Sequence, residues 1–412
     1  MKTPTVASLK KVTPENLARL GAERLAAIVA DAADTRPELK RRLRMELAAE
    51  QGAEHLALEL DKRLNTLDAS RSKVSWRKRP TFVADLEVLR VLIAERLAEL
   101  DPAAALARMW AFMDLARRLG TRVRDRDGEL AAVFDRAATD VGHLIARQRD
   151  ARPADSLVEA VSRNPAAWAE WLPAVLEHAP KATVQAVLEK ARERQGGSPG
   201  WAGILRQVAD AAGDVDAFLA TFTAQAIRTP PIAAEAARRL LAAGRVEEAG
   251  RMLQAAGGRT AEPDFDWESA LIDYLDAAGE GEAAQQARWA SFERTLSAER
   301  ARAFTRRLPD FEDVEAENRA FDHAARHPDA QRGLQFLMEW PALPEAATMI
   351  EARADELRVS DQQAELWAGR LRPRQPRAAH TLLRKAAAAA FRRRDFATCD
   401  RLTQEADTIE LD

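Results

Sequence analysis

The sequence predicts an all-α fold, either an α-solenoid of tetratricopeptide-like or HEAT-like repeats or a stack of layered antiparallel helix pairs. Alanine, leucine, arginine and glutamate dominate the chain, and all four are good helix formers. Period-two runs of β-branched and aromatic residues, which would predict strands, are absent. One corner sequence, Ala-Ala-Gly, ends one helical run and precedes another at residues 211–213, 242–244 and 277–279.

The three corners indicate a repeat. Their glycines, Gly213, Gly244 and Gly279, are 31 and 35 residues apart, which is near the period of two-helix solenoid repeats. A tight turn between helices often requires a left-handed residue, and glycine adopts that conformation without strain. Repeats of this kind stack on their neighbours and present extended surfaces for binding. The corners therefore favour a binding protein over an enzyme.

The first half of the chain, residues 1–194, is predicted to be an N-terminal helical array. A helix should begin at Pro14, because proline suits the first turn, and leucines spaced by four mark another at 56–67. A polar loop should follow at 70–80. Caps and apolar spacing predict further helices at about 37–51, 86–100, 102–120, 133–145 and 165–175.

The second half, residues 201–412, is predicted to be a C-terminal tetratricopeptide-like repeat region. The segment Gln195–Gly200 (QGGSPG) is the strongest break in the chain and the candidate boundary between the halves. After the three corners, prolines predict helical hairpins around 308–309, 327–328 and 341–344. A last hairpin turns at residues 393–395 and has arginine where the others have glycine.

Composition limits the class of protein. The first eleven residues contain no apolar stretch that would serve as a secretory signal, and no run is long and apolar enough to cross a bilayer. The single cysteine, Cys399, excludes an intrachain disulfide and cysteine-based metal sites. We therefore expect a cytoplasmic protein without membrane contact and without a cofactor.

The charge is unevenly distributed, although the net charge is only −3. Residues 62–79 carry seven basic side chains and one acid, and residues 370–394 carry nine basic side chains and no acid. The rest of the chain must then carry a net charge of −18. Such asymmetry is informative about binding partners.

The segment 70–79, called the basic loop below, is the leading candidate for a binding site. It contains five cations, three hydroxyls and one tryptophan, a set that suits phosphate contacts and stacking on a base. The alternative is that the cations are merely solvated and the tryptophan fills a seam between helices. The candidate binding residues are Arg71, Lys73, Trp76, Arg77, Lys78 and Arg79.

A second basic segment, 370–377 (RLRPRQPR), is expected to be extended because it contains two prolines. Its arginines would point into solvent or contact an acidic partner segment, nucleic acid, or the acidic face of this chain or a second copy. The candidate residues are Arg370, Arg372, Arg374 and Arg377.

Two further groups of residues could form sites. In the acidic segment 310–317, Phe311 and Val314 are expected to share one helix face with Phe321 and leave the carboxylates outward. His323 and His327 have the i, i+4 spacing of zinc ligands but lack the glutamate of the metalloprotease motif, since Ala324 follows the first histidine. No nucleophile elbow, phosphate loop or dinucleotide fingerprint occurs in the chain.

Three functions follow, in this order. The first is a protein-interaction scaffold or adaptor with a protein partner. The second is nucleic-acid binding through the basic loop. The third is an uncharacterised metal-dependent hydrolase with a site around the two histidines.

Two resemblances extend this interpretation. Residues 236–256 (AARRLLAAGRVEEAGRMLQAA) and 270–291 resemble tetratricopeptide-type helix pairs, without the fuller signature of that repeat. The chain as a whole resembles a family of proteobacterial helical proteins of unknown function, for which the resemblance implies no activity, cofactor or catalytic residue. The C-terminal part is shorter than is usual for that family. The family resemblance rests on residues 39–47, 70–89, 288–313 and 323–329.

Overall fold

The computed structural model describes residues 12–149, 152–194, 200–256 and 264–411, and within these ranges the chain contains helices and no strand. The all-α prediction is therefore confirmed. The chain forms two compact units, Met1–Phe222 and Thr223–Asp412. The expected break at Gln195–Gly200 lies almost wholly outside the described residues, and the two units divide later in the chain.

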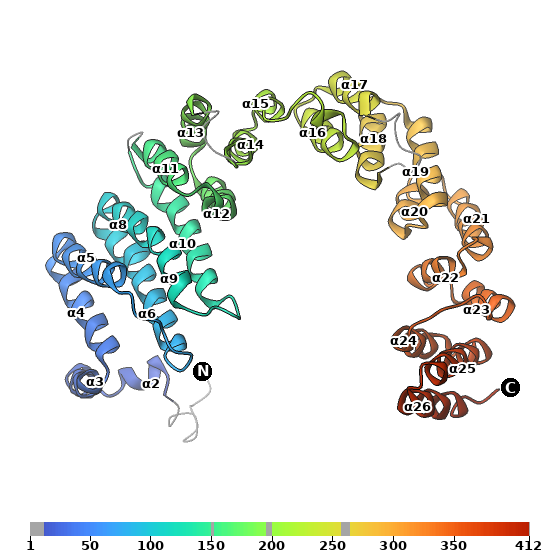
Figure 1. Cartoon of the computed structure of the whole chain (residues 1–412), viewed down its shortest axis with the longest axis horizontal. Helices are drawn as coiled ribbons and strands as arrows, with labels where there is room; N and C mark the ends of the chain where they lie inside the picture. Colours follow the sequence, from blue (N-terminus) through green and yellow to red (C-terminus); the bar gives the residue numbers. More distant parts are fainter. Residues whose placement is uncertain (1–11, 150–151, 195–199, 257–263, 412) are drawn as a thin grey trace. The chain divides into compact units, whose positions relative to one another are not determined.

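The first unit is a succession of short helices, drawn from blue to green in Figure 1. They are α2 (Pro14–Ala18), α3 (Ala22–Thr35), α4 (Pro37–Gln51), α5 (Ala53–Ala69), α6 (Arg79–Val91), the π-helix η1 (Leu92–Leu97), α7 (Ala98–Leu100), α8 (Pro102–Asp114), α9 (Ala116–Arg122), α10 (Glu129–Ala146), α11 (Arg152–Arg163), α12 (Pro165–His178), α13 (Lys181–Glu193), α14 (Trp201–Ala212) and α15 (Val215–Leu219).

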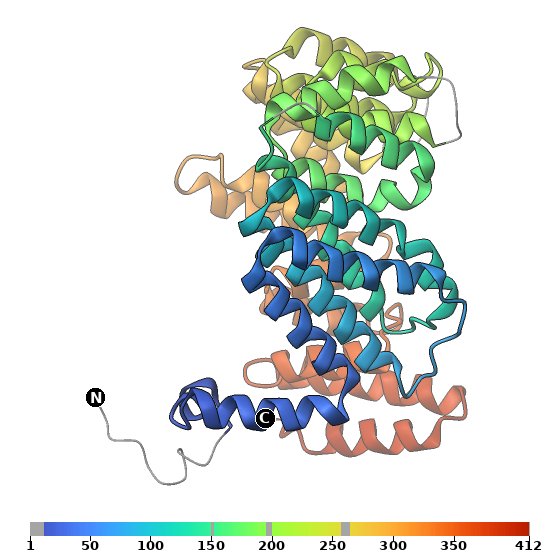
Figure 2. The same ribbon diagram turned by 90° about the vertical axis from the view of Figure 1, so that its left-hand side faces the viewer.

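Alternate helices of the first unit pack on each other, which gives two layers. Helix α10 packs on α8 and on α12, and α12 packs on α14, whereas α11 packs on α13. Figure 2 shows these helices lying across one another in successive layers. Leucines and aromatic rings fill the interior; the rings of Phe112 and Phe134, for example, lie 5.3 Å apart. The expected single helix from Pro14 is instead two helices, because Gly21 breaks it at a positive φ of 79°.

The second unit continues the all-helical pattern. Its elements are the 3₁₀-helix η2 (Ala226–Arg228), α16 (Pro230–Ala242), α17 (Val246–Ala256), α18 (Phe265–Ala277), α19 (Gly281–Thr295), α20 (Ala298–Thr305), α21 (Glu312–Arg326), α22 (Ala330–Glu339), α23 (Leu343–Arg353), α24 (Asp361–Leu371), α25 (Pro376–Arg392) and α26 (Phe396–Asp407). Consecutive helices from α18 to α23 pack on each other, and α25 packs on α23, α24 and α26.

The three corner glycines are left-handed, as the sequence predicts. The φ angles of Gly213, Gly244 and Gly279 are 68°, 74° and 79°. In each corner the next backbone N–H donates to a carbonyl five residues back; Arg245, for example, donates to Leu240 at 2.8 Å. This is the hydrogen bond of a Schellman turn, which ends one helix and directs the chain into the next.

The last hairpin makes the same turn without glycine. Arg394 has a φ of 63°, and the Asp395 N–H donates to the carbonyl of Ala390 at 3.0 Å. A left-handed conformation is unfavourable for a residue with a Cβ, so this corner is strained relative to the other three.

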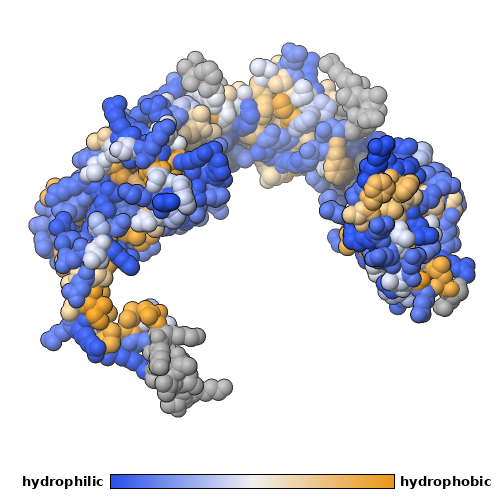
Figure 3. Space-filling model, turned by 60° about the horizontal axis from the view of Figure 1, so that its bottom comes forward, coloured by the Kyte–Doolittle hydropathy of each residue, from blue (hydrophilic) through white to orange (hydrophobic). Residues whose placement is uncertain are grey.

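Polar residues cover most of the face shown in Figure 3, with hydrophobic residues in separate patches. No helix among the described residues has the length and apolar character needed to cross a membrane.

Candidate functional site

The basic loop connects α5 to α6 and is irregular from Ser70 to a turn at residues 76–78. Helix α6 begins at Arg79, so the last two residues of the loop predicted over 70–80, Arg79 and Pro80, are helical. The loop was therefore located correctly from the sequence, and its end was placed slightly too late.

Arg122, at the end of α9, holds the backbone at the start of the basic loop. Its guanidinium donates to the carbonyls of Leu67 and Ser72 at 2.9 and 3.0 Å and to the hydroxyl of Ser70 at 3.0 Å. In return, the N–H of Val74 donates to the carbonyl of Arg122 at 3.0 Å. Hydrogen bonds from a charged donor contribute more than neutral ones, so this part of the loop is anchored.

Trp76 and four of the five cations of the loop, in contrast, are exposed. Trp76 is 77% exposed, so the alternative that it fills a seam between helices is wrong. Its one ring contact is with the guanidinium of Arg77, which lies 5.3 Å from the ring centroid. The side chains of Arg71, Lys73 and Lys78 are exposed and form neither an ion pair nor a hydrogen bond with any residue in the described ranges.

Arg79 differs from the other cations of the basic loop. Its guanidinium pairs with Asp127 at 2.5 Å and with Glu129 at 3.4 Å, and it also donates to the carbonyl of Arg124 at 3.2 Å. Arg79 therefore ties the start of α6 to the segment before α10, and its charge is neutralised within the chain.

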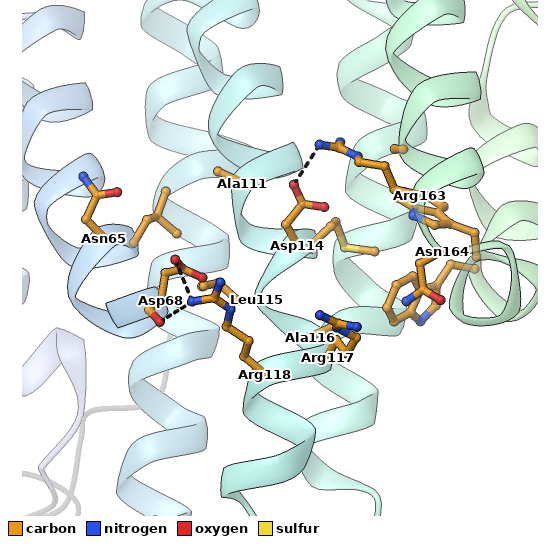
Figure 4. A pocket seen from close by; sticks show the side chains of 15 residues that line it. Asn65, Asp68, Ala111, Asp114, Leu115, Ala116, Arg117, Arg118, Arg163 and Asn164 are labelled. Carbon is orange, nitrogen blue, oxygen red and sulfur yellow. Dashed lines mark hydrogen bonds and ion pairs between the residues drawn. The ribbon is translucent and has the colours of Figure 1, made fainter. Parts of the chain in front are cut away.

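A cavity of about 540 Å³ lies next to the anchored end of the basic loop, between the ends of α5, α8 and α11 and the beginnings of α9 and α12 (Figure 4). Asp68 and Arg118 line the cavity, and Asp68 lies two residues before the basic loop. Arg118 pairs with the carboxylate of Asp68 at 2.9 Å and donates to its carbonyl at 2.8 Å, just before the loop begins. The cavity and the basic loop are therefore adjacent parts of one surface of the first unit.

The second basic segment is not extended, contrary to expectation. Residues 372–374 form a tight turn between α24 and α25, and Pro376 begins α25, where proline is favourable because it needs no N–H partner. Arg372 donates to the carbonyl of Thr408 at 2.7 Å, and Arg377 also has a partner within the chain. Arg370 and Arg374 are exposed without an ion pair or hydrogen bond among the described residues.

The two histidines form local hydrogen bonds. His323 Nε2 donates to the carbonyl of Glu293 at 2.9 Å, and His327 Nδ1 accepts from the N–H of Asp329 at 3.1 Å. Their ring centroids are 6.2 Å apart, and the described part of the chain holds no group of three or more histidine, cysteine or acidic side chains placed to bind a metal. The expected burial of Phe311 and Val314 is wrong, since both are exposed, Phe311 at 85%.

The sequence did not reveal a polar layer buried between α18, α19 and α20. Arg288 is only 2% exposed and pairs with Asp276, and Ser291 and Arg294 both bind the carboxylate of Glu268. Burial lowers the pKa of Arg300, whose guanidinium contacts Ser269 and the carbonyl of Phe265. Buried charges of this kind rarely add stability compared with apolar packing, but they do restrict which arrangement of helices is allowed.

Fold and surface together define an all-helical, repeat-like protein with left-handed corner turns. The chain belongs to the family of unknown function DUF6880, whose model matches residues 7–198 and 158–396. The predicted resemblance to an uncharacterised helical family is confirmed to that extent.

The other comparisons add little. No curated protein matches the chain. Among solved structures it is similar to a circular tandem repeat protein with novel repeat topology and enhanced subunit contact surfaces. That similarity covers 97% of this chain and 87% of the other at 15% identity, with a TM-score of 0.22, which is too low to support an argument about this chain.

Proposed function

We propose that this chain is a protein-interaction scaffold or adaptor of the α-solenoid type, and that the basic loop binds an acidic segment of a protein partner. The observation that carries this proposal is the contrast between the anchored backbone of the basic loop and its free cations. A loop that is already ordered loses little entropy when it binds, so its contacts contribute more of their energy to affinity. The repeat-like helical fold supports the same class of function.

A protein partner fits the charges better than a nucleic acid. The basic loop offers four cations that form no ion pair with any residue in the described ranges, Arg71, Lys73, Arg77 and Lys78. The chain outside residues 62–79 and 370–394 carries a net charge of −18, which repels a long polyanion more strongly than a short acidic segment. A cytoplasmic location is part of this proposal.

The test compares the tagged full chain with the variant R71A/K73A/R77A/K78A in affinity purification from the native lysate, with and without nuclease. We expect a partner that survives nuclease and carries an acidic segment. A synthetic peptide of that segment should bind the variant at least tenfold more weakly. The matched control, R370A/R374A, removes two equally exposed arginines and should bind within twofold of the wild type. A peptide that binds the loop variant as tightly as the wild type would refute the proposal.

Nucleic-acid binding is the second candidate, and the exposure of Trp76 beside Arg77 is the observation in its favour. An aromatic face and a guanidinium together suit an unstacked base and its phosphate. If a labelled oligothymidylate bound through the four free cations, the logarithm of its affinity would fall with the logarithm of salt concentration at a slope of about −3. Partner proteins that disappear after nuclease treatment would favour this second candidate over the first.

A further inference from the structure

The cavity beside the basic loop combines an apolar wall with polar side chains, several of which form no hydrogen bond with any described residue. Five helices contribute to it, and its volume of about 540 Å³ lies within the usual range of ligand pockets. Figure 4 shows Asn65 and Asp68 on one side of it and Arg163 and Asn164 on the other. Its lining comes entirely from the first unit.

Two asparagines in this lining have unused amide groups. Asn164 occupies the N-cap position of α12, where an asparagine side chain usually accepts a hydrogen bond from the first helical turn, yet it makes no such bond. Neither its amide nor that of Asn65 forms a hydrogen bond with any residue in the described ranges. An amide that carries both a donor and an acceptor matches the N–H and C=O of an extended peptide unit.

The cavity also has an excess of positive charge. Its three arginines face two aspartates, and Arg117 has no acidic partner in the described part of the chain. The guanidinium of Arg163 forms an ion pair with Asp114 at 3.6 Å, which is too long for a hydrogen bond, so its N–H groups form no hydrogen bond with any described residue. The donors of Arg117 and Arg163 are therefore available to a carboxylate from outside.

Tryptophan rings form an apolar wall of the cavity. The rings of Trp168 and Trp171 meet edge to face with centroids 5.6 Å apart, and neither indole N–H has a hydrogen-bond partner among the described residues. Small side chains, Ala111, Ala116 and Ala160, leave space for a main chain to approach. An apolar wall beside polar groups suits a peptide that has both kinds of side chain.

We infer that this cavity binds an extended peptide segment, pairing its backbone with Asn65 and Asn164 and an acidic side chain with Arg117 and Arg163. This inference rests on the proposed function and specifies it, because it makes the segment that reaches the basic loop an extended acidic peptide. A small organic anion would pair with the arginines, but it would leave the amides of Asn65 and Asn164 without hydrogen-bond partners.

The test is selection of a library of random twelve-residue peptides, displayed on phage, against the full chain. We expect enriched peptides that contain aspartate or glutamate. Synthetic copies should bind N65A/N164A and R117A/R163A at least tenfold more weakly than the wild type. The matched controls N318A and R147A remove exposed side chains of the same types elsewhere and should bind within twofold of the wild type.

A further variant, Asn164→Asp, separates binding from folding. Aspartate is a good N-cap, so the variant should unfold at the same temperature or higher, whereas binding should weaken because a carboxylate replaces an amide donor. Failure to enrich peptides, or peptides that bind all cavity variants as tightly as the wild type, would overturn the inference. If peptides that bind the cavity variants normally still bound the loop variant R71A/K73A/R77A/K78A more weakly, the proposed function of the basic loop would stand and only the inference about the cavity would fail.

Discussion

The two basic regions of this chain look alike in sequence but differ in structure. In residues 62–79, the four cations without a partner lie together in the basic loop beside an exposed tryptophan. In residues 370–394, several cations are paired locally; Arg393, for example, pairs with Asp361 and Arg384 with Asp407. The comparison shows that local charge density does not identify a binding surface. What distinguishes the first region is that its exposed cations lie together on one short loop whose backbone is anchored.

The largest expected difference is in the free energy of unfolding after each basic region loses its nearby tryptophan, Trp76 for the first and Trp367 for the second. Trp367, in α24, is 5% exposed, so Trp367→Ala should lower the free energy of unfolding by about 3 to 5 kcal/mol. Trp76→Ala should change it by less than about 0.5 kcal/mol, because the ring is almost fully in solvent. Urea denaturation of both variants measures the change in the free energy of unfolding. A large loss of stability for Trp76→Ala would show that the ring has a structural role.

The next difference is in the stability lost when an anchoring arginine is removed, Arg122 for the basic loop and Arg372 for the turn between α24 and α25. Arg122→Ala removes three hydrogen bonds to the basic loop and its approach, and should lower the free energy of unfolding by about 3 kcal/mol. Arg372→Ala removes a single bond to the carbonyl of Thr408 and should lower it by about 1 kcal/mol. Equal losses in denaturation would contradict the claim that the basic loop is the more strongly anchored segment.

The third prediction concerns the corner at the end of the second basic region. Arg394→Gly should raise the free energy of unfolding by about 1 kcal/mol, since glycine adopts a positive φ without strain. Thermal unfolding of the variant measures this change in stability. Arg392→Gly, at a helical position, is the control and should destabilise the protein. A destabilising Arg394→Gly would mean that the arginine side chain has a role that its geometry does not show.

The smallest expected effect is a pH-dependent contribution to stability from Asp395, the residue that caps α26 next to this corner. The hydrogen bonds from Thr398 lower the pKa of Asp395, which caps α26, and the nearby Arg393 lowers it further. Because the folded pKa is lowered, this cap stabilises the protein above the unfolded pKa of about 3.9 and loses its effect as the pH falls through the folded value. Asp395→Ala should therefore be less stable than the wild type at pH 7, and the difference should shrink below pH 4. A difference that does not change with pH would rule out the carboxylate as its source.

Features that depend on short stretches of sequence were predictable. Gly213, Gly244 and Gly279 turn the chain because a left-handed residue is needed between closely packed helices, and that requirement is visible in a few residues. The position of the basic loop was predictable for the same reason, because its polar residues lie between two segments with regularly spaced leucines. The belief that prolines keep residues 370–377 extended was wrong because Pro376 begins a helix instead.

Features that depend on residues from distant helices were not predictable. Asn65 and Asn164 line opposite sides of one cavity, and single-sequence periodicity carries no information about which helices become neighbours. Arg288 is a second example, because a charged residue is normally exposed and only its pairing with Asp276, from a different helix, makes its burial tolerable. Likewise, the exposure of Trp76 and Phe311 depends on what packs beside them rather than on their own hydrophobicity.

The most direct test of the account is to map what touches the basic loop. A photo-crosslinking residue would replace Ser75, which is exposed in the loop, and a control would carry it at Gln375 in the turn between α24 and α25. After illumination in native lysate, the account predicts that the chain modified at position 75 crosslinks to an acidic segment of a protein partner, identified by mass spectrometry, and that the control does not. Crosslinks to that partner only from position 375, or crosslinks from position 75 only to nucleic acid, would contradict it.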